Sequence, residues 1–147
     1  MRTSLITLLL VSGFSMLTKA QFEVKLNPVV LLFEGGVVSA EFPLNPNFGA
    51  ETTLIAVPDG GFGVFGMGKY YFRPRMGIDR FYAGAYVGFL EDLYGLGFHF
   101  GTKMVAQRGL IFEFSIGAGR EFNDGGFFPY GKLDIGYRFG EVKNMME

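Results

Sequence analysis

The chain has 147 residues, a formal net charge of −1 and no cysteine. That length suits a single domain, and the lack of cysteine excludes a disulfide framework and a thiolate metal site. Charged residues make up 18% of the chain, against about 25% in ordinary soluble domains, while phenylalanine and glycine number 18 and 23. The slight negative charge excludes the basic surface that nucleic-acid binding requires, so we expect no nucleic-acid partner.

Residues 1–20 have the three parts of a secretory signal peptide. Arg2 supplies a positive charge, the stretch 5–17 is apolar, and Thr18-Lys19-Ala20 places small residues at positions −3 and −1 of a cut before Gln21. The alternative is an uncleaved anchor, but the apolar stretch is short for a membrane span. We therefore predict cleavage and export.

Apolar and polar residues begin to alternate directly after the predicted cleavage site. Glu23 and Lys25 point to one face of an extended chain and their apolar neighbours to the other, because successive strand residues face opposite ways. The same apolar spacing continues as far as Leu32. We therefore predict a first strand over residues 22–33.

Seven further segments follow this pattern, and the last is the clearest. The third segment is weaker, and in the fourth Phe65 and Met67 share the polar face of Lys69. From Leu133 to Phe139 every second residue is apolar, whereas Lys132, Asp134 and Arg138 take the alternate positions. Each segment is close to the roughly 9–11 residues that a tilted membrane-spanning strand needs. The eight predicted strands are 22–33, 37–44, 49–57, 64–73, 80–90, 95–105, 110–121 and 128–139.

The charged residues fall on one face of the predicted strands and nearly balance in sign. That face is also rich in glycine, as the narrow lumen of an eight-stranded barrel requires, since it has little room beyond side chains. Buried charges must be paired to be tolerated. We therefore predict a lumen charge network: Lys25, Lys69, Lys103, Lys132 and Arg138 with Glu23, Glu41, Glu51, Glu113, Glu121 and Asp134.

These patterns predict an all-β fold, an eight-stranded antiparallel up-and-down transmembrane β-barrel over residues 21–139. Residues 1–20 precede it as the signal peptide, and 140–147 follow it as a flexible tail. The apolar face then meets lipid, because turning a lysine or arginine to the middle of the bilayer would cost about 2–4 kcal/mol. The alternative is a soluble exported barrel with the faces reversed, which would bind a small hydrophobic ligand inside.

The connectors predict a barrel with two unlike ends. All four odd-numbered connectors are acidic and three contain a glycine pair, whereas Arg73, Arg75 and Arg80 fall in or beside the fourth and Arg108 falls in the sixth. No acidic connector has the spacing of a calcium loop. We expect no metal and no cofactor.

His99 is the only histidine and the centre of one possible catalytic arrangement. If the sixth and seventh strands turn over Ala106–Arg108, His99 lies opposite Ser115, with Glu113 one diagonal step away. These residue types support acyl transfer, so a lipid A-modifying acyl hydrolase or transferase is a second alternative. We favour a structural histidine and expect no catalysis, because all three side chains would face the lumen, where a lipid ester does not readily reach.

Residues 21–139 resemble the small eight-stranded outer-membrane β-barrel proteins of Gram-negative bacteria, the OmpX-like and OmpA-like group. The likeness lies in the segment LNPVVLLFEGG (26–36), the segment GKYYF (68–72) and the glycine- and aromatic-rich final strand. It implies a monomer in the outer membrane, in contact with outer-membrane lipid and lipopolysaccharide, with a structural or accessory role in the envelope.

The resemblance also implies insertion by the barrel-assembly machinery. That machinery recognises a final strand with alternating aromatic residues, and Tyr137 and Phe139 fit the signal. Eight residues follow Phe139, so the signal is not at the end of the chain.

Overall fold

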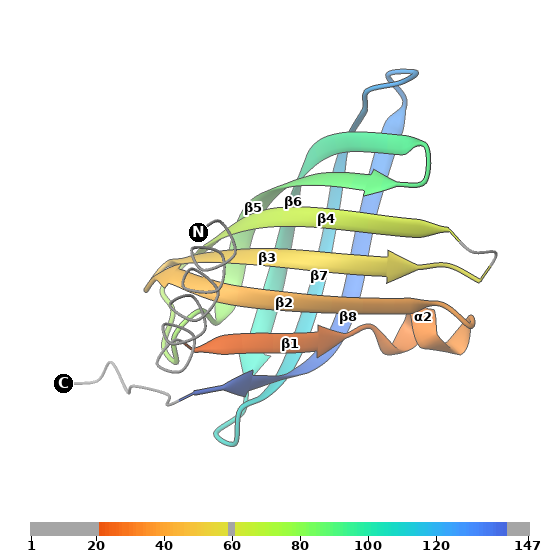
Figure 1. Ribbon diagram of the computed structural model, residues 1–147. Helices are drawn as coiled ribbons and strands as arrows, with labels where there is room; N and C mark the ends of the chain where they lie inside the picture. Colours follow the sequence, from red (N-terminus) through yellow and green to blue (C-terminus); the bar gives the residue numbers. More distant parts are fainter. Residues whose placement is uncertain (1–20, 59–60, 141–147) are drawn as a thin grey trace, which may run out of the picture.

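The computed structural model describes residues 21–58 and 61–140, which form a closed antiparallel β-barrel (Figure 1). Each strand pairs with the next in chain order, and the last pairs back with the first. The strands are β1 (Phe22–Leu26), β2 (Gly36–Asn45), β3 (Phe48–Ala56), β4 (Phe62–Tyr71), β5 (Arg80–Leu90), β6 (Leu93–Val105), β7 (Leu110–Glu121) and β8 (Phe127–Phe139). The predicted all-β, eight-stranded barrel is confirmed.

One short helix, α2 (Pro28–Leu32), joins β1 to β2. No helix in the described ranges is long and apolar enough to cross a membrane. The predicted signal peptide, 1–20, and residues 141–147 of the predicted tail lie outside the described residues.

The predicted first strand, 22–33, is wrong in its second half, because β1 ends at Leu26 and α2 follows. Asn27 caps the helix: its side-chain oxygen accepts hydrogen bonds from the backbone N–H groups of Val29 and Val30, at 3.1 and 3.2 Å. Asparagine is among the best N-caps, and Pro28 suits the first helical position because its missing N–H needs no partner there. These two residues favour a helix where the apolar spacing predicted a strand.

The short β1 leaves the ring of strands unevenly paired. β1 pairs with β8 only from Phe22↔Phe139 to Leu26↔Ile135, whereas β7 pairs with β8 from Leu110 to Arg120. Beyond Ile135 the wall beside β8 is therefore continued by α2. Pro129 lies in this stretch of β8, as expected for a residue that is confined to strand edges.

The barrel has two ends that differ in what they carry. The α2 end, on the right in Figure 1, holds α2 and the exposed acidic residues Glu34, Glu91 and Asp124. The terminal end, where β1 begins and β8 ends, holds the exposed Arg73 and Arg108.

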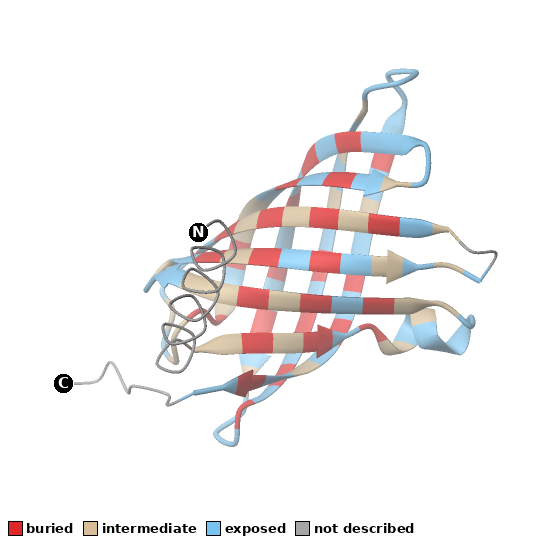
Figure 2. Ribbon diagram, in the orientation of Figure 1, coloured by how far each residue is buried: buried red, intermediate tan, exposed pale blue. Residues whose placement is uncertain are grey.

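Burial alternates along nearly every strand (Figure 2). On β6, Lys103 is 1% exposed, whereas Phe98 is 66% exposed; on β7, Glu113 is 1% and Ile116 is 57% exposed. The inner wall is thus charged and glycine-rich, and the outer wall is apolar. Several inward glycines let neighbouring backbones approach closely: a Cβ on Gly97 would lie 2.5 Å from the carbonyl oxygen of Ala118.

We predict that Gly97→Ala destabilises the barrel by about 1–3 kcal/mol, the usual cost of overpacking. The added methyl group would also lie 2.6 Å from the Cα atom of Gly119. Because that atom belongs to the backbone, only a shift of the strand can relieve the overlap. Denaturant unfolding of the refolded protein, followed by circular dichroism, measures the loss. Gly66→Ala is the control, because its Cβ meets only Val87, at 3.9 Å; equal effects of the two changes would contradict the prediction.

Candidate functional site

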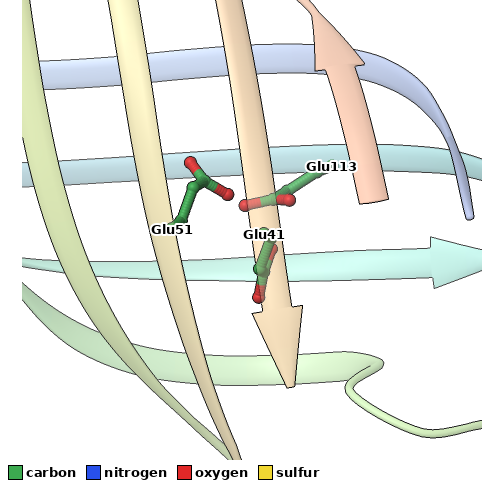
Figure 3. A group of neighbouring side chains, drawn as sticks. All are labelled: Glu41, Glu51 and Glu113. Carbon is green, nitrogen blue, oxygen red and sulfur yellow. The ribbon is translucent and has the colours of Figure 1, made fainter. Parts of the chain in front are cut away.

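The middle of the lumen holds three carboxylates that converge from different strands. Glu41 on β2, Glu51 on β3 and Glu113 on β7 are fully buried and bring one oxygen each within 4.8 Å of the others (Figure 3). Carboxylates at this spacing are typical of a cation site.

Two ammonium groups already occupy the space between these carboxylates. Lys69 Nζ lies 2.5 Å from an oxygen of Glu51, 2.5 Å from one of Glu113 and 3.1 Å from one of Glu41. Lys25 Nζ contacts the same three carboxylates. The cluster is therefore a set of shared ion pairs between five side chains, in which two ammonium groups offset most of the negative charge of the three carboxylates.

The ion pairs continue toward the terminal end of the barrel. Lys103 Nζ lies 2.7 Å from Glu23 and 3.1 Å from Glu41, and Arg138 Nη2 lies 2.5 Å from Glu23. A carboxylate that accepts from a guanidinium and an ammonium has both of its oxygens satisfied. Glu23 thus links β1 to β6 and β8.

Lys132 connects the central cluster to β8. It contacts Glu51, lies 3.4 Å from Glu113 and lies 3.0 Å from Asp134. Within the described strands the buried charges balance, five cations against five anions. They are Lys25, Lys69, Lys103, Lys132 and Arg138 with Glu23, Glu41, Glu51, Glu113 and Asp134.

Glu121 is the one predicted member of the network that lies apart from it. It is the last residue of β7, at the rim of the α2 end, where it is partly exposed. In the part of the chain that the structure describes, it forms no ion pair. The strand was correctly predicted to end at Glu121, but alternation placed this residue on the inward face and did not show that the network stops short of the rim.

The connector from β4 to β5 folds into the terminal end of the lumen. Ile78 is 2% exposed and packs against Tyr71 and Tyr82, and Arg138 donates to the backbone carbonyls of Met76 and Ile78. The arginines of this connector predicted only a basic turn. Its apolar residues Met76 and Ile78 stand among arginines and are followed by Asp79, which is also buried.

The tyrosines beneath this connector tie it to the charges. Tyr82 donates to Glu113 at 2.5 Å, and Tyr71 donates to Glu41. Lys103 Nζ lies 4.6 Å above the ring of Tyr71, within the range of a cation–π contact. The β4–β5 connector, which we call the Ile78 plug, and the charge network are therefore one packed unit.

An aromatic layer fills the lumen near the α2 end. Phe65, Met67, Tyr86 and Phe128 are buried together, with Tyr130 packed against them. The Tyr86 hydroxyl donates to the backbone carbonyl of Phe128 at 2.9 Å, so the polar group of the ring is satisfied. Sequence analysis did not find this layer, although Phe65 and Met67 share the face of Lys69 and so point inward with it.

His99 lies between the aromatic layer and the charges, and the predicted pairing with Ser115 is wrong. The β6–β7 turn extends to Gly109, whose φ of +86° suits glycine. Val105 consequently pairs with Ile111, and His99 pairs with Gly117. The register is thus displaced by two residues from the prediction.

Among the described residues His99 forms no hydrogen bond to Ser115 or Glu113. It is fully buried, its ring lies 5.5–6.0 Å from the rings of Tyr82, Tyr86 and Tyr130, and neither ring nitrogen has a hydrogen-bond partner in the described residues. Glu113 is committed to lysines and to Tyr82. A general base needs a hydrogen bond to the nucleophile that it activates, and none joins these side chains.

Tyr137 and Phe139, the predicted assembly signal, both lie on the outer wall at the terminal end. Their rings meet edge to face at 5.0 Å, and Phe139 stacks on Phe22 at 4.9 Å. They thus cover the short β1–β8 seam from outside.

We predict that Glu113→Gln lowers the free energy of unfolding by about 3–5 kcal/mol, because removing one partner of a buried network leaves the others without compensation. Glu113 contacts Lys25, Lys69 and Lys132, so three ammonium groups lose a carboxylate. Glu121→Gln, on the same face of the same strand, is the control and should change it by less than about 0.5 kcal/mol. Denaturant titration of both variants tests this; similar losses would refute the network's role in stability.

Comparison of the chain with protein-family models, with curated proteins and with solved structures found no match. The function therefore has to be argued from the geometry of the barrel itself.

Proposed function

We propose that the protein is an integral outer-membrane β-barrel with a closed, salt-bridged lumen and a structural or accessory role in the cell envelope, without catalysis. One observation carries the proposal: charges are buried inside the cylinder, and large apolar side chains are exposed on its outer wall. Soluble monomers rarely expose contiguous apolar patches above a few hundred Å². A barrel with these faces suits hydrocarbon outside.

The ends of the outer wall support the same proposal. Aromatic side chains gather in contact near the terminal end, where Tyr70 meets Phe72 at 5.2 Å and Phe72 meets Phe81 at 5.6 Å. At the α2 end Tyr94 and Phe122 lie 5.8 Å apart. Aromatic belts are typical of the two membrane–water interfaces.

The choice of the outer membrane rests on the predicted signal peptide and on the resemblance to outer-membrane barrels. In that setting the partners are outer-membrane lipid, lipopolysaccharide and the barrel-assembly machinery, and the protein is a monomer. The filled lumen supports a structural rather than a transport role: the Ile78 plug closes one end and the aromatic layer occupies the other.

Neither alternative function gains support from the geometry. A soluble barrel that binds a hydrophobic ligand needs an apolar cavity, whereas this lumen is centred on Lys25, Lys69 and three carboxylates. A lipid A-modifying enzyme needs an assembled acyl-transfer site, which His99, Ser115 and Glu113 do not form. The lipid substrate of such an enzyme would also have to pass through the packed wall of the barrel to reach these residues.

We predict that the expressed protein stays in the membrane fraction after a high-salt or alkaline wash and needs detergent for extraction. A folded barrel retained in mild detergent should also migrate faster than the boiled chain on a gel, because the closed ring of strands stays compact until it is heated. Recovery in the soluble periplasmic fraction would overturn the proposed function in favour of the soluble barrel.

We further predict that Phe98→Arg impairs insertion more than Met104→Arg. Both residues face outward on β6, but Phe98 lies near the middle of the strand and Met104 near its end. Arginine costs about 2–4 kcal/mol at the bilayer midplane and about 0–1 kcal/mol near the interface. Folding titrations into phosphatidylcholine vesicles compare the two; equal penalties would argue against a bilayer around this strand.

A further inference from the structure

The outer wall has a hollow where α2 meets β7 and β8. A cavity of about 310 Å³ lies there, lined on the helix side by Val29 and Val30 and on the barrel side by the outward-facing Phe114, Ile116 and Leu133. This volume is at the lower end of the roughly 300–1,000 Å³ typical of small-molecule sites. We call it the α2 groove.

A missing side chain opens the α2 groove on the barrel side. Gly131 borders it, is exposed, and has nothing within 4 Å of the position that a Cβ would take. The next outward-facing residues of β8, Pro129 and Leu133, both carry side chains. The groove is therefore a local gap between the apolar side chains of β8.

The helix accounts for the other side of the groove. β1 leaves β8 at the pair Leu26↔Ile135, and α2 takes its place in the wall. A helix is about 10 Å wide with its side chains, against about 4.8 Å between paired strands. It also offers no backbone ladder to β8, so it leaves a space that a strand would have closed.

We propose that the α2 groove holds one acyl chain of a membrane lipid. This inference rests on the proposed function, because it requires the outer wall to lie in a bilayer. Val29, Phe114, Ile116 and Leu133 are all exposed and apolar, so the chain enters from the side without crossing a polar surface. Three polar residues, Asn27, Ser115 and Lys132, also line the groove, but all three are buried, so its exposed side chains are apolar.

The nearest charge does not alter the chemistry of the groove. Lys132 also borders the cavity, but its side chain is only 3% exposed and its ammonium group is bound in the lumen to Glu51 and Asp134. The occupant is therefore recognised by its hydrocarbon chain and not by an anionic headgroup.

Photocrosslinking in vesicles tests the proposal. The protein is refolded into phosphatidylcholine vesicles that contain a small share of phosphatidylcholine with a diazirine in the middle of one acyl chain, and labelled peptides are identified by mass spectrometry. Wild-type labelling should concentrate on Val30, Phe114 and Ile116. Gly131→Phe, which fills the groove, should reduce this labelling roughly tenfold, as expected when a site loses several apolar contacts.

Gly66→Phe is the matched control, because Gly66 also faces the outer wall with open space around it and should leave groove labelling unchanged. Val29→Trp closes the groove from α2 and changes no strand, so it should fold even if Gly131→Phe folds poorly. It should reduce groove labelling as much as Gly131→Phe does. Even labelling around the barrel, or labelling that survives both filling variants, overturns the groove but leaves the proposed function intact. No acyl-chain labelling anywhere on a folded barrel overturns the proposed function itself.

Discussion

The charges enclosed by the barrel must neutralise one another, and the register of the strands depends on this requirement. Lys25 and Lys69 share the carboxylates of Glu41, Glu51 and Glu113, which lie on β2, β3 and β7. A charge removed from water costs several kcal/mol unless it is paired. A slip of two residues between neighbouring strands keeps every side chain on its face but separates these pairs. The ion pairs therefore specify the strand register, which the apolar outer wall alone does not fix.

The inward and outward faces could be predicted from the sequence because they depend only on a period of two. Lys132, Asp134 and Arg138 lie inside as that period requires. The pairing of His99 could not be predicted in the same way, since the period is unchanged by a two-residue shift. Gly109 lengthens the β6–β7 turn, and turn length sets the register of a hairpin.

Two other features escaped the sequence analysis for different reasons. At Asn27 and Pro28 a local signal was present, because a capping residue followed by proline favours a helix, but the apolar spacing through Leu32 was weighted above it. The burial of Ile78 had no local signal of comparable strength. It depends on Tyr71, Tyr82 and Arg138. Arg138 is sixty positions away in the sequence, so only the closed barrel brings these partners together.

The inner and outer walls of the barrel place different demands on the chain. Inside, the aromatic layer, His99 and the ion pairs fill successive levels of the lumen, so each side chain has a defined neighbour. Outside, side chains need only be apolar, and small or missing ones such as Gly131 are tolerated because the surrounding medium can fill the space. In the proposed bilayer, lipid completes the packing that the outer wall lacks beside α2.

Arg138 connects three distant parts of the barrel. Its guanidinium reaches Glu23, at the beginning of the described chain, and the carbonyl groups of the β4–β5 connector near the middle. The residue itself lies one position before the end of β8. One guanidinium group therefore both ties the first strand to the last and holds the connector that covers this mouth of the lumen. Loss of that group would loosen the ring and its cover together.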